Sequence, residues 1–460
     1  MLSRQILTQI SQALHAARGL TLYRGIMEDP VCGAMVVFLE KVASQAPLEQ
    51  ILDSYGEIFR LLSVQAIVAQ EKPVGDAWQN HLLNLILYQD NPFSEAAASA
   101  PYEQLSCSLK QAAMWDLNKL QVLHRIEAGA ALASLLKMED ESFLAGCLPL
   151  WDDLHIVSET GRYDRPKARE LKEMLSGRGN WSACLEALAA YYRCAGSGIF
   201  GRYGAFRWVS RYEKLEGIDE PDPVCLEELI GYQAQRQEVV ANTEKFLAGL
   251  PANNILLYGD RGTGKSSTVK ALLNCYQTRG LRLIEVPKSA LGDYPLIIRK
   301  LRGKSLRFIL FVDDLSFEDS EVEYKELKAV LEGGLEVRPD NVLIYATSNR
   351  RHLVREHFSD RGSAGDGDGD LRAGDTVQEK LSLADRFGIM VLFVMPDRSL
   401  YLDIVRGLAE QRGIDIPGSD LDKKALLWAT WHNGRSGRTA RQFIDDLSGE
   451  LGKQKNNKFS

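Results

Sequence analysis

One short stretch, residues 259–266, constrains the fold of this 460-residue chain more than any other. Its sequence, G-D-R-G-T-G-K-S, has the spacing of a phosphate-binding loop. An apolar run at 255–258 precedes the loop, and residues 267–276 have the composition of a helix. Strand, loop and helix in this order are the context in which the motif is specific. We therefore expect a nucleotide-binding α/β domain here, and not an ordinary glycine-rich turn.

Each residue type in the loop suits the binding of phosphate. Glycine lets the backbone turn its N–H groups inward around phosphate oxygens, and the start of the helix adds a positive dipole. Lys265 is expected to reach the β- and γ-phosphates, and the Ser266 hydroxyl to bind Mg²⁺, so the predicted cofactors are ATP and Mg²⁺. The loop residues predicted to bind the nucleotide are Gly259, Asp260, Arg261, Gly262, Thr263, Gly264, Lys265, Ser266 and Ser267.

Composition and charge restrict the location and the partners of the protein. The chain is 45% hydrophobic and 25% charged, as is usual for globular proteins, and its net charge of −7 disfavours nucleic acid as a partner. No apolar run approaches the roughly 20 residues of a membrane span. The N-terminus lacks the pattern of a signal peptide, and the seven cysteines form no C-x-x-C pair. We therefore expect a cytoplasmic protein without a structural zinc site or a disulfide framework.

Residues 1–205 are predicted to form an all-α N-terminal domain. Apolar residues recur there at helical steps of three and four within the segments 34–45, 57–69, 118–137 and 182–193. Most of these apolar stripes are expected to face a core, and the domain is the candidate for recognising a partner. Residues 196–208, rich in glycine and aromatic residues, are either a joint between domains or a tight surface turn.

The second half of the chain alternates between β-rich runs and helical spacers. The predicted strands are 255–258, 281–286, 308–312, 342–347 and 389–394, and a helix is predicted from 226 to 246. This pattern predicts a five-stranded parallel sheet with helices on both faces, in a domain that spans 206–396. Helical periodicity continues through 397–448, the predicted lid, and residues 449–460 form a polar tail.

Polar side chains follow the third and fourth predicted strands. Asp313 is expected to reach Mg²⁺, directly or through water, and Asp314 to act as a general base on the attacking water. The alternative is that both carboxylates cap the end of the strand. Asn349 ends the fourth strand, where an amide could hold the water, although asparagine is also common in turns.

Three arginines near the end of the chain are further candidates. Arg386 precedes the fifth strand and could stabilise phosphoryl charge as a finger, or it could form a surface pair with Asp385. Arg438 and Arg441 are three residues apart at the start of the last predicted helix, so they share a face. Two cations are unfavourable beside the positive end of a helix, and a bound anion would relieve this cost.

An acidic, glycine-rich insert occupies residues 359–370. Its Asp-x-Asp-x-Asp spacing is similar to that of a calcium loop, but Leu371 stands where glycine is needed and Val377 where glutamate is needed. The composition therefore favours a mobile acidic loop.

In their order along the chain, the motifs of residues 222–447 resemble those of AAA+ ATPases. The resemblance implies a P-loop AAA+ module, which is a parallel sheet covered by helices and followed by a small helical lid. The family's site residues then fall on Walker A (259–266), Walker B (Asp313, Asp314), sensor 1 (Asn349), the arginine finger (Arg386), sensor 2 (Arg438) and the adenine-side box (Ile230, Gly231). It also implies a homo-oligomer in which Arg386 acts on the ATP of a neighbouring subunit.

Three segments, 261–267, 381–388 and 434–443, closely resemble a bacterial ATP-binding family that is known only as a domain of unknown function. That family also has a helical N-terminal half, so the resemblance covers most of the chain and implies no substrate.

Three functional classes follow from these features. The first is an ATPase that remodels or regulates a protein partner, whose identity the sequence does not give. The second is a slow ATP-gated switch or adaptor, which Asp314 slightly favours because the usual Walker B residue there is the longer glutamate. The third is a nucleic-acid loader, which the net charge of −7 disfavours.

Overall fold

The structure, a computed structural model, describes residues 4–68, 72–138, 141–154, 165–315, 338–349, 386–432 and 434–456. The chain forms two compact units, Met1–Arg202 and Tyr203–Ser460. The acidic insert at 359–370 and Asp385 lie outside the described residues, and so do the predictions made for them. No helix within the described ranges is long and apolar enough to cross a membrane.

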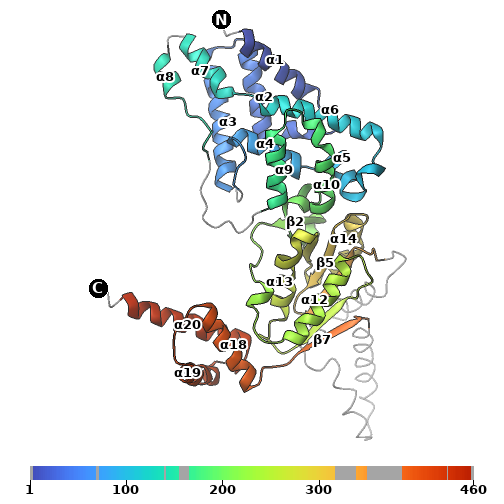
Figure 1. Ribbon diagram of the computed structural model, residues 1–460, viewed down its shortest axis with the longest axis vertical. Coiled ribbons are helices and arrows are strands. Elements are labelled where there is room, and N and C mark those ends of the chain that lie inside the picture. Colours follow the sequence, from blue (N-terminus) through green and yellow to red (C-terminus); the bar gives the residue numbers. More distant parts are fainter. Residues whose placement is uncertain are drawn as a thin grey trace. The chain divides into compact units, whose positions relative to one another are not determined.

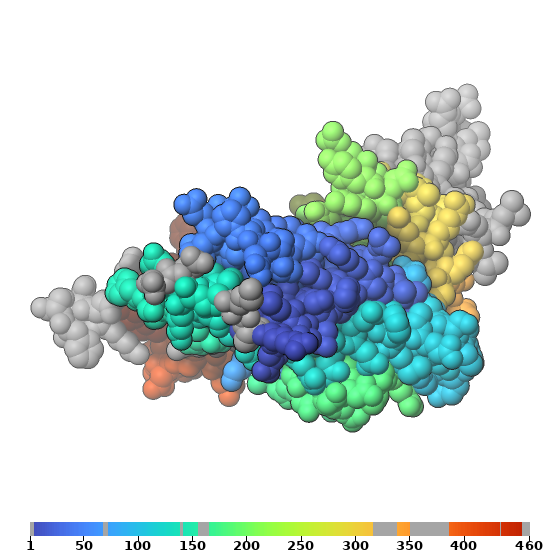
Figure 2. Space-filling model, turned by 90° about the horizontal axis from the view of Figure 1, so that it is seen from above, coloured from blue at the N-terminus to red at the C-terminus, as the bar shows by residue number. Residues whose placement is uncertain are grey.

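Within its described residues, the first unit consists of helices and contains no strand, as predicted (Figure 1). Its α-helices are α1 (Arg4–Arg18), α2 (Pro30–Ala43), α3 (Leu48–Val68), α4 (Ala77–Tyr88), α5 (Pro92–Ser99), α6 (Cys107–His124), α7 (Ala128–Met138), α8 (Ser142–Gly146), α9 (Pro166–Gly177), α10 (Leu185–Ala195) and α11 (Gly198–Arg202). Apolar side chains from most of them, such as Phe38, Leu82 and Leu117, are fully buried in one core. Figure 2 looks onto this unit, and α7, which contacts both α3 and α8, lies with them at its surface.

Local signals explain where several of these helices begin. Asn91 accepts hydrogen bonds from the first backbone N–H groups of α5, and Pro92 occupies the first helical position, where its missing N–H costs nothing. The helical signal predicted over 118–137 falls on two helices. The apolar period over 118–137 crosses a break at 125–127, between α6 and α7. Apolar spacing alone does not register such a break, because Leu123 and Ala128 are buried on both sides of it.

The second unit is an α/β domain followed by a helical lid, which confirms the predicted fold class. Its elements are β1 (Ala205–Val209), β2 (Lys214–Ile218), α12 (Gln233–Leu247), β3 (Ile255–Gly259), α13 (Lys265–Tyr276), β4 (Leu281–Glu285), α14 (Tyr294–Leu301), β5 (Arg307–Val312), β6 (Val342–Ser348), β7 (Ile389–Phe393), α18 (Arg398–Gln411), α19 (Gly418–Trp431) and α20 (Gly437–Asn456). The lid consists of α18, α19 and α20 (Figure 1).

The described strands form one sheet in the order β2-β1-β4-β5-β6-β3-β7, so the prediction of five strands was too low. The two additional strands come from residues 205–218, within and after the stretch predicted as a joint or turn. β1 extends the sheet parallel to β4, and β2 returns antiparallel to β1. The five predicted strands are all present and all parallel to their neighbours.

Alternation of buried side chains explains why this sheet is covered on both faces. Ile309 and Phe311 of β5 belong to the core that α12, α13 and the lid share, together with Leu257 of β3. Phe308 and Leu310, which alternate with them along β5, are equally buried. They point to the opposite face of the sheet, because successive side chains of a strand alternate. Both faces of the central strands are therefore apolar, as in other parallel sheets.

The helix predicted from 226 to 246 begins later than expected. Residues 226–228 form only a 3₁₀ turn, and α12 starts at Gln233. Gly231 and Tyr232 between them have φ values of 79° and 53°, a left-handed backbone that no α-helix accommodates. At the other end of the unit, α20 continues to Asn456, through most of the segment predicted as a polar tail.

Candidate functional site

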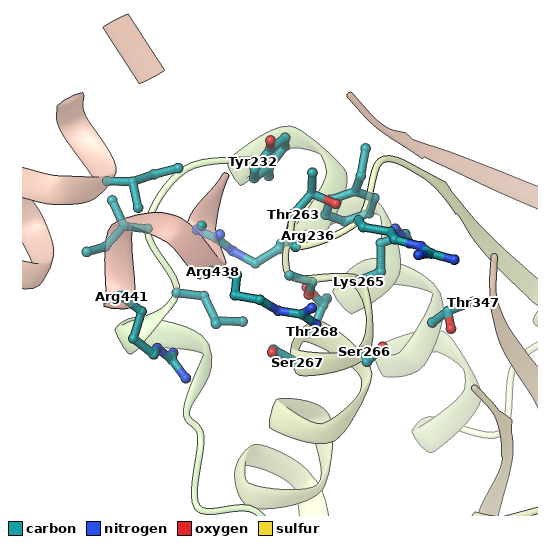
Figure 3. Close-up of a pocket in the computed structure, with 18 of the residues that line it drawn as sticks. Tyr232, Arg236, Thr263, Lys265, Ser266, Ser267, Thr268, Thr347, Arg438 and Arg441 are labelled. Atoms are coloured by element: carbon teal, nitrogen blue, oxygen red, sulfur yellow. The ribbon is translucent and has the colours of Figure 1, made fainter. Parts of the chain in front are cut away.

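A cleft of about 670 Å³ lies where the carboxyl ends of the central strands meet the lid (Figure 3). This volume is within the range of small-molecule sites. Parallel register brings the ends of β3, β5 and β6 to one edge of the sheet, since β6 pairs with both other strands. The residues that line the cleft are Glu228, Leu229, Ile230, Tyr232, Arg236, Arg261, Gly262, Thr263, Gly264, Lys265, Ser266, Ser267, Thr268, Asp313, Asp314, Thr347, Asn349, Phe393, Ile404, Leu408, Gly437, Arg438 and Arg441.

The phosphate-binding loop has the backbone that its glycines were expected to allow. Gly262 and Gly264 have φ values of 73° and 92°, and Gly264 is the residue before α13. Gly259 has no room for a side chain, because a Cβ atom there would lie 2.1 Å from the carbonyl oxygen of Phe393. The loop is therefore tight against β7, and its N–H groups are set at the start of a helix, where anions bind.

Lys265 is buried and bonded within its own loop. Its Nζ donates to the carbonyl oxygens of Gly259 at 3.0 Å and Asp260 at 2.6 Å. Burial lowers the pKa of Lys265 to about 8, although the carboxylates of Asp260 and Asp314 oppose the shift. A phosphate group beside Nζ would favour the charged ammonium and could replace the two carbonyls as its partner.

Asp313 lines the cleft, and two hydroxyl groups hold its carboxylate. Asp313 Oδ1 accepts from Ser266 Oγ at 2.6 Å and from Thr347 Oγ1 at 2.5 Å. Ser266 and Asp313 are the two predicted Mg²⁺ ligands, and both supply oxygen atoms, which Mg²⁺ prefers. The two oxygens are 2.6 Å apart and both residues line the cleft, so this pair could supply ligands to a magnesium ion.

Asp314 has an unusual backbone and a definite side-chain partner. Its φ of 53° is left-handed, and its backbone N–H donates to Thr347 Oγ1 at 2.8 Å. The side chain of Asn349 donates through Nδ2 to Asp314 Oδ1. Thr347 therefore connects Asp313 and Asp314 to β6, the strand that Asn349 follows. Strained backbone of this kind is most often retained at functional sites.

The other end of the cleft is apolar. Ile230, Phe393 and two lid residues, Ile404 and Leu408, line it. Gly231 does not line the cleft, but its left-handed turn is packed against the lid, because a Cβ atom there would lie 3.0 Å from Leu400 Cδ1. An apolar end next to a phosphate-binding loop suits a nucleotide, whose base and phosphates differ in polarity.

The lid contributes cations to the polar end. Arg438 and Arg441 both line the cleft from α20, and in Figure 3 the Arg438 side chain extends toward the phosphate-binding loop. The backbone N–H of Arg438 donates to the carbonyl oxygen of Gly262 at 3.2 Å. With Arg236, Arg261 and Lys265, the lining has five cations against Glu228, Asp313 and Asp314. This local excess of positive charge suits an anionic ligand, despite the net negative charge of the chain.

Most of the predicted site residues line this cleft, and four do not. Gly259 and Asp260 lie beneath the loop surface, Gly231 supports the turn, and Arg386 is absent from the lining. A finger that acts on a neighbouring subunit would not line its own cleft.

Sequence reasoning missed Tyr232, Arg236 and Thr347. Thr347 had a detectable signal, since it and Ser348 are polar residues at the end of an apolar strand, β6. Arg236 lies on the first turn of α12, and its Nη1 donates to the carbonyl oxygen of Gly231. Burial lowers the pKa of the Arg236 guanidinium.

A second group of potential metal ligands, Asp29, Cys32 and His81, occurs in the helical unit. Asp29 accepts from the N–H groups of Val31 and Cys32 as the N-cap of α2, and His81 Nε2 lies 2.8 Å from its Oδ1. Hydrogen bonding and capping account for this group, so we assign no metal to it.

The sequence matches the profile of a family described as "Protein of unknown function (DUF815)" over residues 201–451. No curated protein matches the chain. Among solved structures, the RuvB Holliday junction branch migration motor of Thermotoga maritima is 15% identical, with a TM-score of 0.30, over 49% of this chain and 72% of that chain. A variant of the same protein is 16% identical, with a TM-score of 0.31, over the same shares. Likeness at this level carries no conclusion about what this chain binds or acts on.

Proposed function

The chain belongs to the DUF815 family, whose description names no activity, and we propose that it is an AAA+ protein that binds Mg²⁺-ATP and hydrolyses it. One observation carries this proposal: an unbroken set of contacts joins Ser266, Asp313, Thr347, Asp314 and Asn349 around the end of the phosphate-binding loop. A purely structural anion site would not need two carboxylates beside the phosphates, because they repel the anion unless a cation is bound between them.

The residues of the cleft divide the chemistry among them. Ser266 and Asp313 would hold Mg²⁺, which neutralises phosphate charge when it is bound. Lys265 exchanges its two carbonyl partners for phosphate oxygens. Asp314 accepts a proton from the attacking water as general base, and Asn349 orients that water or the Asp314 carboxylate. Arg438 stabilises negative charge that develops on the phosphates.

Arg386 completes this mechanism from another subunit in our proposal. A guanidinium that approaches the γ-phosphate of a neighbouring chain would stabilise the transition state, an effect worth about 10³–10⁵ in rate for arginine fingers. The protein would then be active as a homo-oligomer. Its helical unit, which lies outside the nucleotide site, is the part that would recognise a protein partner.

A slow ATP-gated switch is the second candidate, and the Asp314–Asn349 hydrogen bond favours it. A carboxylate that is already bonded to an amide must give up or share that bond before it can take a proton from water. Asp314 is also shorter than the glutamate usual at this position, which increases its distance from the water. A nucleic-acid loader is disfavoured by the net charge of −7.

Replacing Asp314 by Asn tests the chemistry. The amide cannot accept the proton, so ATP should still bind while steady-state phosphate release is lost. Asp222→Asn is a suitable control, because Asp222 is a surface carboxylate of the same unit that pairs with Lys270. If the Asp314→Asn protein releases phosphate at the parent's rate, Asp314 is not the base. Tight ATP binding by a parent without measurable turnover would favour the switch.

The same Asp314→Asn variant, with ATP trapped, is the best reagent for finding the partner. Proteins that co-purify with it and depend on the presence of ATP should be compared with those recovered by Lys265→Ala, which should not bind ATP. A partner retained equally by both variants would not be controlled by the nucleotide.

A further inference from the structure

Four residues, 394–397, connect β7 to the first lid helix, α18. In Figure 1 this segment runs from the edge strand of the sheet to the lid. Val394 and Met395 are 50% and 42% exposed, so side-chain packing does little to fix their position. The backbone of this segment is instead held by hydrogen bonds from the nucleotide site.

A single peptide group in this segment is held at both of its polar atoms. The Tyr232 hydroxyl donates to the carbonyl oxygen of Val394 at 2.6 Å. The N–H of Met395, which belongs to the same peptide group, donates to Oδ2 of Asp260. Because one peptide unit is nearly rigid, two bonds from opposite sides determine both its position and its orientation.

The two side chains come from different segments of the unit. Tyr232 lines the cleft and is the residue before α12, where its backbone is left-handed. Asp260 is the second residue of the phosphate-binding loop and is only 8% exposed. Its own backbone is bonded on both sides, through its N–H to Phe393 and through its carbonyl oxygen to Lys265 and Thr263.

We propose that Tyr232 and Asp260 are positioning residues that latch the Val394–Met395 peptide group and thereby make the position of the lid depend on nucleotide occupancy. The inference rests on the proposed function, because it assumes that Lys265 binds phosphate. In the structure Lys265 Nζ donates to the Asp260 carbonyl oxygen at 2.6 Å. When the ammonium turns to phosphate, Asp260 loses this bond, and its hold on Met395 weakens.

A second contact lets the same loop act on the lid at its last helix. The Arg438 N–H donates to the Gly262 carbonyl oxygen at 3.2 Å. Gly262 is also packed closely against Ser436, because a Cβ atom at Gly262 would lie 3.0 Å from Ser436 Oγ. The phosphate-binding loop therefore contacts the lid both where the chain enters it, at Met395, and at the start of α20. A change in the loop reaches the lid at two points that are more than forty residues apart in the sequence.

Hydrogen–deuterium exchange of the full-length chain tests the latch, with the segment 394–400 as readout and Mg²⁺ with a non-hydrolysable ATP analogue as probe. In the parent, the analogue should raise exchange of this segment several-fold. Asp260→Asn and Tyr232→Phe preserve side-chain shape. Without the analogue, each should already exchange several-fold faster at the Met395 amide, because Asp260→Asn removes the charge that strengthens one bond and Tyr232→Phe removes the other bond. Adding the analogue should then cause little further change.

Two matched variants control for loss of a hydroxyl or a charge elsewhere in the unit. Tyr276→Phe removes a hydroxyl bonded to Glu244, and Asp293→Asn alters a carboxylate that accepts from Trp208. Both should respond to the analogue as the parent does. If Asp260→Asn and Tyr232→Phe also respond like the parent, the two bonds are merely structural and the latch is refuted.

Failure of the latch and failure of the proposed function give different results. A parent that is stabilised against heat by Mg²⁺-ATP, yet shows no change in exchange at 394–400, would keep the function and overturn the coupling. A parent that gains no thermal stability from Mg²⁺-ATP would overturn both.

Discussion

Lys265→Ala is the sharpest test of the nucleotide site, because the side chain is buried and its two partners are known. The substitution removes the ammonium and leaves the carbonyl oxygens of Gly259 and Asp260 without that donor. The unliganded variant should therefore be somewhat less stable than the parent. The informative quantity is consequently the increase in melting temperature that Mg²⁺-ATP causes in each protein, and not the melting temperature itself.

The expected increase in melting temperature depends on the strength of the hydrogen bond that Lys265 would make to phosphate. A hydrogen bond to a charged group contributes about 1.5–3 kcal/mol, so the loss of Lys265 should weaken ATP binding by a factor of about 10–150. With ATP at 100 times the parent's Kd, the parent is stabilised by about 2.7 kcal/mol and the variant by about 0.3–1.4 kcal/mol. For a unit of this size, this corresponds to about 5–11 °C in the parent and about 1–6 °C in the variant.

Differential scanning calorimetry with and without Mg²⁺-ATP measures both shifts. Lys270→Ala is the matched control, since Lys270 lies on the same helix, is half exposed and pairs only loosely with Asp222 at 3.6 Å. It should shift as the parent does. Equal shifts in the parent and in Lys265→Ala would show that the ammonium does not contact the ligand, and the phosphate-binding interpretation of the loop would have to be abandoned.

Three further predictions concern assembly, division of labour and pH. Arg386→Ala and Asp314→Asn should each be nearly inactive, and a mixture of the two that is shown to co-assemble should regain phosphate release if Arg386 acts between subunits. An inactive mixture would indicate that Arg386 acts on the ATP of its own subunit. An Arg386→Ala protein with the parent's activity would indicate that Arg386 is only a surface residue. A fragment of residues 206–460 should bind ATP by calorimetry, whereas 1–205 should be helical by circular dichroism and should not bind. A folded 206–460 fragment without affinity would mean that the helical unit completes the site. Burial, together with Arg125 nearby, lowers the pKa of His124 from 6.5 to about 4. Between pH 6.5 and 4, His124 therefore binds a proton in the unfolded chain but not in the folded chain. The free energy of unfolding should fall as the pH drops from 6.5 to 4. His124→Gln should flatten this dependence in denaturant titrations, and an unchanged slope would contradict the assignment.

The parts of the site that were predictable from sequence share one property: each depends only on its own strand and the residues that follow it. Asp313 and Asn349 come directly after apolar runs, so their places at the tips of β5 and β6 follow from those runs alone. Parallel strands end at one edge, which then brings the two tips together. The predicted nucleotide, by contrast, is a chemical interpretation that the experiments above must test.

The residues that were missed depend on which elements become neighbours. Thr347 matters because β6 lies between β3 and β5, so that its hydroxyl reaches Asp313, and neither spacing nor composition specifies that order. Tyr232 is placed by a left-handed turn that interrupts what had been predicted as one helix. β1 was not predicted, because its exposed Arg207 interrupts the apolar run expected of a buried strand. In the structure Arg207 pairs with Glu285 of the neighbouring strand β4.

The hairpin of β1 and β2 also determines how this chain can be recombined with others. The family profile begins at residue 201 and the second unit at Tyr203, although the alternation typical of the α/β domain becomes visible in the sequence only after residue 221. A graft made at the visible change in composition would separate β1 from β4 and leave the edge of β4 unpaired. An exchange of the helical unit for another domain should therefore be spliced at Arg202, so that the hairpin stays with the α/β domain whose sheet it extends.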